Sequence, residues 1–196
     1  MFAPRVLRNC IGLSTMCAVV LAASAPLAFA QGGGYQQDLI KSIEDARGKL
    51  IQLAEATPPG KYSYRPGKGV RSTGEVFLHV VQANYLLPTL MGVKVPEGMD
   101  PMKIENSGAD KAKTIEMLKS SFEHAENAIR NTPDADLEKT VKIFDHDGTV
   151  RDVEFIVLSH AHEHLGQSIA YARVNGIVPP WTAAAEAAAA AKPKTK

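Results

Sequence analysis

Three of the six histidines in the chain fall within five consecutive positions, at His160, His162 and His164. Each residue of an α-helix advances by about 100°, so His160 and His164 would lie on one face, one turn apart. Two neutral imidazoles at this spacing can bind a single metal ion, and zinc, nickel, copper and iron all accept such nitrogens. The alternative is that both are surface or hydrogen-bonded histidines that bind no metal.

A third histidine strengthens the metal hypothesis. His79 lies in an apolar helical stripe, between Val76 and Ala83. Three histidines that face a protein core would be costly to bury without polar partners, and one ion would satisfy all of them. We therefore expect His79, His160 and His164 to bind one divalent metal ion. Zinc and nickel are the first expectations for its identity, and iron and manganese are the alternatives.

His162 is expected to lie outside this site. It lies about 200° around the helix from His160, so it should not bind the same ion. It falls on a second apolar face, which consists of Phe155, Leu158, Leu165 and Ile169. That face could be buried against another helix of the same domain or in a symmetric homodimer, and the pattern favours neither.

Other polar residues give weaker signals. His124 and His146 stand beside charged residues and are expected at the surface. Glu163 should be solvated, and His162-Glu163 lacks the second histidine of a His-Glu-x-x-His zinc motif. Tyr171 shares the helix face of His160 and His164 and is the nearest candidate for a polar residue that assists the metal site. The alternative is that Tyr171 only packs against its neighbours. No carboxylate is evidently placed as a general base.

Apolar residues recur with the period of an α-helix in four segments. These segments are residues 39–53, 76–86, 115–129 and 153–175. Ser72 and Glu75 form a capping-box signal before the second segment, and Gly176 fits a left-handed C-cap after the fourth. Residues 140–144 alternate in polarity, and Asp147-Gly148 suggests the turn of a short hairpin-like insert. Four amphipathic helices in one small domain favour an all-α four-helix bundle with this insert before the last helix.

The composition fits one globular domain. The chain has 196 residues, 45% of them hydrophobic, and its 22 basic and 21 acidic side chains give a net charge of +1. This balance argues against a nucleic-acid partner, because such proteins normally carry a basic excess. We expect the bundle to span residues 35–181, between a flexible glycine-rich leader at 31–34 and a disordered Ala/Lys-rich tail at 182–196.

Residues 1–30 have the features of a secretory signal peptide. Arg5 and Arg8 form a basic start, an apolar run follows, and Ala28-Phe29-Ala30 fits a signal-peptidase site. We predict cleavage before Gln31 and export to the periplasm or the outside of the cell. The alternative is an uncleaved membrane anchor, but the apolar run is shorter than the ~20 residues of a spanning helix. No stable membrane anchor should therefore remain after cleavage.

Cleavage would also remove both cysteines, Cys10 and Cys17. The exported chain would then have neither disulfides nor thiolate metal ligands. It would keep 20 basic and 21 acidic side chains, so it would stay close to neutral.

Two segments carry a set of motifs in a specific order. Residues 160–181 read HAHEHLGQSIAYARVNGIVPPW, with a His-x-x-x-His pair followed by Gly-Gln, Tyr-x-Arg and Gly-Ile-x-Pro-Pro. Residues 62–87 read YSYRPGKGVRSTGEVFLHVVQANYLL, an Arg-Pro stretch that leads into a helix with one histidine. Residues 160–181 resemble the closing helix of the DinB/YfiT-like family. Residues 62–87 resemble another hallmark of that family, the Arg-Pro stretch before a helix with one histidine. From the first segment to the second, the matching motifs extend over about 120 residues.

The resemblance implies a four-helix bundle with a divalent metal on three histidines. The family's ligand positions fall on His79, His160 and His164, and its Gly-Gln pair falls on Gly166 and Gln167. Gly166 would allow close approach of a helix, and Gln167 would make a contact behind the metal ligands. Characterised branches of the family are thiol-dependent transferases or isomerases. An exported chain departs from them, because low-molecular-weight thiols are concentrated in the cytoplasm.

These expectations favour a metal-dependent hydrolase or transferase that acts on an unidentified small molecule. Three protein ligands leave a coordination position open, as in catalytic zinc sites, whereas structural zinc sites usually have four. One alternative is a metal-binding or stress-response module without turnover. Another is a structural bundle whose histidines bind nothing.

Overall fold

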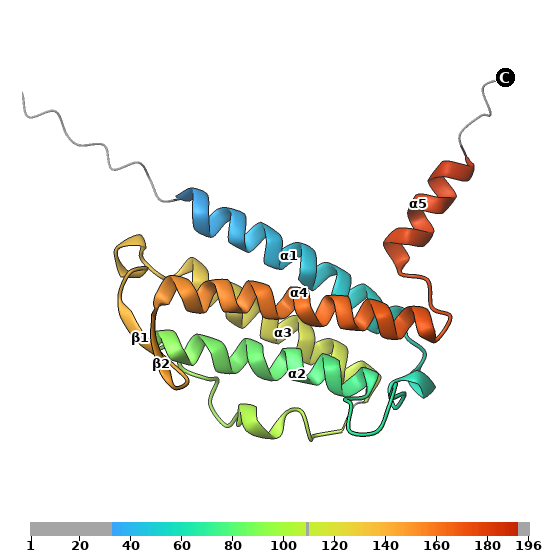
Figure 1. Cartoon of the computed structure of the whole chain (residues 1–196), viewed down its shortest axis with the longest axis horizontal. Coiled ribbons are helices and arrows are strands. Elements are labelled where there is room, and N and C mark those ends of the chain that lie inside the picture. The colour runs from blue at the N-terminus through green and yellow to red at the C-terminus, as the bar shows by residue number, and fades with distance from the viewer. Residues whose placement is uncertain (1–32, 109, 192–196) are drawn as a thin grey trace, which may run out of the picture. The chain divides into compact units, whose positions relative to one another are not determined.

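The computed structural model describes residues 33–108 and 110–191 and is mostly helical (Figure 1). Its α-helices are α1 (Gly33–Ala56), α2 (Thr73–Leu86), α3 (Lys111–Arg130), α4 (Val150–Val174) and α5 (Pro180–Ala190). Short 3-10 helices lie in the connections, namely η1 (Pro59–Lys61), η2 (Leu87–Met91), η3 (Pro101–Lys103) and η4 (Asp134–Asp136). A two-stranded hairpin precedes α4. The prediction of an all-α four-helix bundle with an insert before its last helix is confirmed.

Helices α1 to α4 form the bundle. Each of α1 and α2 packs against both α3 and α4, so α1 and α2 take diagonally opposite corners. This arrangement makes α2 and α4 direct neighbours, and these are the two helices that carry the predicted metal-binding histidines. In Figure 1 they run side by side, with the hairpin at one end and the connection between α1 and α2 at the other.

The apolar stripes expected from the sequence face the interior of the bundle. On α1 every stripe residue is 5% exposed or less, namely Leu39, Ile43, Ala46, Leu50 and Leu53. Large buried side chains from the other helices include Phe77 and Leu78 of α2 and Leu118, Phe122 and Ile129 of α3. Burial of each side chain of this size contributes about 1.5–3 kcal/mol. This core therefore fixes the helices that position the site.

Both histidine-bearing helices begin with a capping box. At the start of α2 the Ser72 hydroxyl accepts a hydrogen bond from the Glu75 N–H, and the Glu75 carboxylate accepts one from the Ser72 N–H, as predicted. Thr149 and Asp152 form a second capping box, so α4 begins three residues before its predicted start. After α4, Gly176 has a φ of +73°, which is the predicted left-handed C-cap.

The turn of the hairpin lies elsewhere than the sequence suggested. Strand β1 (Thr140–Ile143) pairs antiparallel with β2 (His146–Thr149), so the turn consists of Phe144 and Asp145. Asp147-Gly148 lies within β2, and the prediction of a turn there is wrong.

Gly148 serves close packing instead of a turn. It pairs with Val141 across the hairpin, and a Cβ atom at this position would lie 2.6 Å from Cδ1 of Ile143. The Ile143 side chain is 1% exposed. Its burial over Gly148 sets the register of the strands, and the register places the turn directly after Ile143.

The start of the described chain differs from the predicted flexible leader. Gly33 and Gly34 form the first turn of α1, so the prediction is wrong for these two residues. The Gln36 side chain anchors this turn, because its amide donates to the Ile129 carbonyl at 3.1 Å and to the Glu154 carboxylate at 2.9 Å. Residues 31 and 32 and the predicted signal peptide at 1–30 lie outside the described residues. Within the described part, no helix is both long and apolar enough to cross a membrane.

The Ala-rich segment after the bundle is helical, so the prediction of a disordered tail is wrong for the part that forms α5. Pro180 occupies the first turn, where its missing N–H costs no helical hydrogen bond, and alanine has the highest helix propensity. Trp181 packs partly against the core, and the Lys49 ammonium of α1 lies 6.0 Å from its ring centre. Residues 192–196 lie outside the described residues.

The second apolar face of α4 is divided between interior and surface. Leu165 is buried in the core, and Leu158 and Ile169 pack partly against it, whereas Phe155 is 59% exposed. Burial within the same bundle therefore accounts for Leu165. A homodimer formed through Phe155 stays a prediction.

Candidate metal centre

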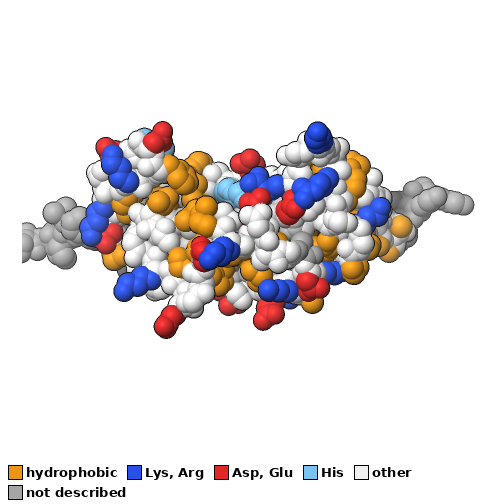
Figure 2. Space-filling view, turned by 90° about the horizontal axis from the view of Figure 1, so that it is seen from below, with side chains coloured by type: hydrophobic (Ala, Val, Ile, Leu, Met, Phe, Trp, Pro, Cys, Tyr) orange, Lys and Arg blue, Asp and Glu red, His pale blue; other side chains and the backbone are white. Residues whose placement is uncertain are grey.

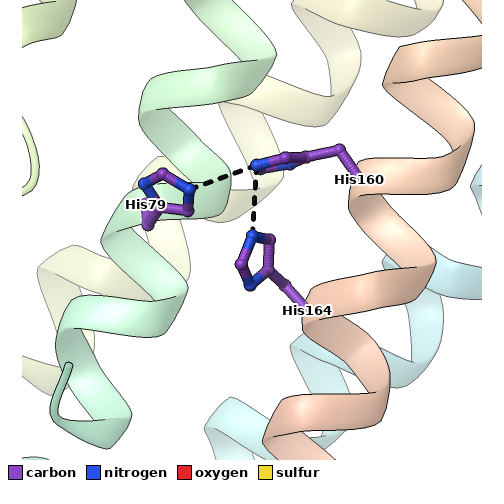
Figure 3. Close-up of side chains that lie close together, drawn as sticks. All are labelled: His79, His160 and His164. Carbon is purple, nitrogen blue, oxygen red and sulfur yellow. Dashed lines mark hydrogen bonds between the residues drawn. The ribbon is translucent and has the colours of Figure 1, made fainter. Parts of the chain in front are cut away.

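The structure brings together the three histidines that the sequence singled out. His79 comes from α2 and His160 and His164 come from α4, and their rings point toward one another between the two helices (Figure 3). The Nε2 atom of His160 lies 3.2 Å from Nε2 of His79 and 3.1 Å from Nε2 of His164. One ligand atom from each residue lies within 4.8 Å of the others. We call these residues the three-histidine cluster.

The spacing of the ring nitrogens fits a shared metal ion. Imidazole nitrogens bound to zinc at about 2.0–2.1 Å in tetrahedral geometry lie about 3.3 Å from one another. The observed Nε2 separations of 3.1 and 3.2 Å are close to this value. The donor set consists of neutral nitrogens only, which suits zinc, nickel, copper or iron rather than magnesium or calcium. The cluster is therefore suited to a divalent transition metal.

Hydrogen bonds behind the rings orient two of the three histidines. The Nδ1–H of His79 donates to Oε2 of Glu105 at 2.9 Å, and the Nδ1–H of His164 donates to Oε1 of Gln167 at 2.8 Å. Because an oxygen acceptor holds the proton on Nδ1, the lone pair of each ring lies on Nε2, which faces the cluster. The expected contact of Gln167 behind the ligands is confirmed. Both partners favour the tautomer that a metal ligand needs.

Tyr171 and Arg71 support these two contacts. The Gln167 amide donates to the Tyr171 hydroxyl at 3.1 Å, and this hydroxyl donates to the Arg71 carbonyl at 3.3 Å. The guanidinium of Arg71 contacts the Glu105 carboxylate at 2.6 and 3.3 Å. Tyr171 is therefore both a packed side chain and a polar support, and its hydrogen bond with Gln167 connects it to the cluster.

Glu105 is the residue of this site that the sequence did not reveal. It lies just after η3, in a connection without helical period, and it is 26 residues away from His79. Partial burial raises the pKa of the Glu105 carboxyl, but hydrogen bonds from Arg71 and His79 outweigh this and hold the pKa below its ordinary value. Glu105 is therefore an ionised acceptor for His79, and no sequence signal apart from its charge could have identified it.

Burial keeps His160 and His164 neutral before any metal binds. Burial lowers the pKa of His160 to about 3, and positive charge on His164, His79 or Arg71 lowers it further in the same direction. Burial also lowers the pKa of His164, although the hydrogen bond that it donates to Gln167 acts in the opposite direction. At neutral pH His160 and His164 are therefore uncharged, and each ring has one nitrogen lone pair that could bind a metal ion.

The structure excludes the neighbouring polar residues from the cluster. His162 is exposed and its Nδ1–H donates to the Leu158 carbonyl at 3.1 Å, so its predicted separation from the cluster is confirmed. Glu163 and His146 are exposed, as predicted. Gly166 is also exposed, and a Cβ atom there would meet nothing within 4 Å. The expectation that Gly166 allows close approach of a helix is therefore wrong.

His124 is less exposed than predicted. Its ring packs against Tyr85 at 5.1 Å between centroids, because α3 and α2 are neighbours in the bundle. Its Nε2 atom is buried and has no hydrogen-bond partner among the described residues. Burial lowers the pKa of His124. The prediction of a surface histidine is wrong, since the charged residues beside it in sequence do not determine what α2 places over it.

Two pockets of opposite character adjoin the cluster. The arginine-side pocket has a volume of about 530 Å³, and its polar lining includes Arg65, Arg71, Glu75, Glu105 and Gln167. The hairpin-side pocket has a volume of about 170 Å³ and is lined by Gln82, Ala83, Leu86, Leu87, Phe144 and Ile156 together with two of the histidines. Figure 2 shows this face, with a central histidine surface between hydrophobic side chains on one side and charged side chains on the other. Small molecules can therefore reach the cluster from solvent.

Comparisons with known proteins agree with the fold. Residues 42–168 match the model of the DinB superfamily. A DinB-like protein from Bacillus cereus aligns with a TM-score of 0.64 at 15% identity, over 74% of this chain and 95% of that chain. The DinB-like protein YjoA from Bacillus subtilis aligns with a TM-score of 0.58 at 19% identity, over 72% of this chain and 93% of that chain.

A third structure carries a functional description. YfiT from Bacillus subtilis, described as a probable metal-dependent hydrolase with an unusual four-helix bundle topology, aligns with a TM-score of 0.59 at 15% identity. This alignment covers 73% of this chain and 89% of YfiT. No curated protein matches the chain in sequence. The segment matched by the family model covers well over half of the chain and includes His79, His160 and His164. The chain belongs to the DinB superfamily.

Proposed function

We propose that this protein is an exported metal-dependent enzyme, a hydrolase or transferase that acts on a small molecule. The convergence of three imidazole side chains in the three-histidine cluster, with Nε2 of His160 within 3.2 Å of the Nε2 atoms of His79 and His164, carries this proposal. Three protein ligands are the number found in catalytic zinc sites, in which the remaining position binds water or substrate. YfiT, which shares the fold, is described as a probable metal-dependent hydrolase.

We propose zinc or nickel as the ion, held by His79, His160 and His164. Such an ion would supply Lewis acidity and would lower the pKa of a water molecule bound to it. The chain's own residues orient the ligands, since Glu105 and Gln167 fix the tautomers of His79 and His164. Glu105 is ionised and already bonded to Arg71 and His79, so it positions a ligand and is not a free general base.

Export is part of the proposal and rests on the sequence of residues 1–30. Their basic start, apolar run and Ala-Phe-Ala end fit a cleaved signal peptide. Intact mass of the protein recovered from the periplasm or medium tests this directly. A form that begins at or near Gln31 supports export, and a form that keeps Arg5 contradicts it.

The enzyme proposal is tested with zinc-loaded protein and a panel of chromogenic carboxylic and phosphoric esters. Turnover should require the metal and should be absent from His160→Ala, while His162→Ala should keep it. His162→Ala is a matched control, because it removes an imidazole two residues away that lies outside the cluster. Activity that persists in metal-free His160→Ala protein would contradict the assignment of the site.

A non-catalytic metal-binding or stress-response module is the second candidate. One observation favours it: the carboxylate that contacts the cluster, Glu105, is occupied by two hydrogen-bonded partners. Such a module should bind the ion as tightly as an enzyme would, but it should turn over no substrate. Metal binding without hydrolytic or group-transfer activity would therefore favour this second candidate.

A further inference from the structure

The hairpin-side pocket is apolar although it borders the three-histidine cluster. Leu86 comes from the end of α2, Ile156 from α4, and Phe144 from the turn between β1 and β2. Among the six non-histidine lining residues, Gln82 is the single polar side chain. His79 and His160 line the same pocket, so a molecule bound there would lie directly beside the cluster.

Phe144 has a backbone conformation that is unfavourable for its residue type. Its φ is +55°, and it is the one non-glycine residue of the described chain with a positive φ. A bulky side chain in the left-handed region is strained, and turns at such positions normally use Gly, Asn or Asp. Phe144 is nevertheless 67% exposed, so burial in the core does not explain its conformation. Strained residues of this kind cluster at binding sites, and this ring lines the hairpin-side pocket.

The opposite wall of the site would not accept an apolar group. In the arginine-side pocket Arg65 pairs with Glu75, and Arg71 pairs with Glu105. An apolar group placed over these ion pairs would desolvate charges without new partners, which is unfavourable. The two pockets therefore distinguish the ends of a bound molecule, and an apolar end belongs on the hairpin side.

We infer that the substrate carries a compact apolar group that binds in the hairpin-side pocket while its adjoining polar group reaches the metal position. This inference rests on the proposed function. The pocket volume of about 170 Å³ sets the size of that group. A dry apolar cavity of about 150 Å³ holds one benzene ring, so the group is a single six-membered ring or a short alkyl chain. Phe144, Leu86 and Ile156 are the residues that determine this specificity.

The test uses two metal-binding probes that differ only in alkyl length, acetohydroxamate and hexanohydroxamate. Isothermal titration of zinc-loaded wild-type protein should show tighter binding of hexanohydroxamate by about tenfold or more, because its extra methylenes leave water. Phe144→Gly removes the ring while keeping a residue that accepts positive φ, and Ile156→Trp narrows the pocket. Both variants should bring the ratio of the two affinities close to one.

Asp145→Ala is the matched control, since Asp145 shares the turn with Phe144 and does not line the pocket. It should keep the wild-type ratio. Equal affinities of the two probes for wild-type protein, or a ratio that survives both pocket variants, would overturn the inference. If acetohydroxamate does not bind zinc-loaded protein at all, the proposed function fails instead.

Discussion

Two parts of the bundle hold buried imidazole nitrogens, and they differ in what those nitrogens face. In the three-histidine cluster the Nε2 atoms converge, and Glu105 and Gln167 hold protons on the outer nitrogens. His124 on α3 stands alone against Tyr85, with a buried Nε2 atom that bonds to nothing among the described residues. Burial favours the neutral ring in both places. Convergence and outer hydrogen bonds, not burial, therefore distinguish a metal centre from a packed histidine.

Cavity size does not distinguish the two regions. The pocket beside His124 has a volume of about 490 Å³, and its lining includes Asn127, Asn131, Asp136 and Lys139. This volume lies between those of the two pockets that adjoin the three-histidine cluster, about 530 Å³ on the arginine side and about 170 Å³ on the hairpin side. The pocket beside His124 contains one histidine, and among the described residues His124 belongs to no group of three or more potential metal ligands.

The largest expected difference between the two regions is in metal-dependent stability. Zinc at about 100 times its dissociation constant should stabilise the wild-type fold by about 2.7 kcal/mol, because the ion binds the folded bundle. His164→Ala should lose this increment, and His124→Gln should keep it. Thermal denaturation with and without zinc measures both. If zinc no longer raised the thermal stability of His124→Gln, the three-histidine cluster and the His124 region would not differ in metal binding.

A second, smaller effect tests the outer hydrogen bonds that His124 lacks. Glu105→Ala removes the acceptor for Nδ1 of His79, and loss of such a partner typically weakens metal binding by about 10–100-fold. Glu163→Ala removes an exposed carboxylate beside His164 and should leave the affinity unchanged. Competition with a chelator gives both affinities. Equal losses in the two variants would mean that Glu105 acts through general charge rather than through its hydrogen bond.

The smallest effect concerns pH and His124. Burial lowers the pKa of His124 in the folded protein below its ordinary value near 6.5. As the pH falls through about 6.5, the unfolded chain gains a proton that the folded chain does not, so the fold loses stability. His124→Gln should remove this part of the acid sensitivity. Urea unfolding of zinc-free protein at pH 7.5 and 5.5 should therefore show a smaller loss for the variant than for wild type, and equal losses would show that His124 is not the cause.

The sequence predicts the helices and the cluster because both depend on local periodicity. His160 and His164 are one turn apart on any helix, and the stripe around His79 already faces the core. The features that the sequence does not reveal depend on tertiary contacts. Glu105 reaches His79 from a connection without period, and Tyr85 covers His124 from another helix.

The hairpin and Gly166 also show that local sequence patterns do not determine tertiary contacts. The buried Ile143 side chain moves the turn away from Asp147-Gly148, which local turn preferences alone would choose. Gly166 matches a family motif, yet its surroundings are open. A motif identifies a position, whereas the role of the residue there depends on neighbours that are distant in sequence.

Metal content of zinc-loaded, gel-filtered protein tests the central claim most directly, with wild type, His160→Ala and His162→Ala compared side by side. The two variants remove imidazoles two residues apart on α4, one inside the three-histidine cluster and one exposed. Wild type and His162→Ala should each retain about one equivalent of zinc, because three imidazoles suffice to hold the ion, and His160→Ala should retain none. If His162→Ala loses the metal while His160→Ala keeps it, the three-histidine cluster is not the metal centre.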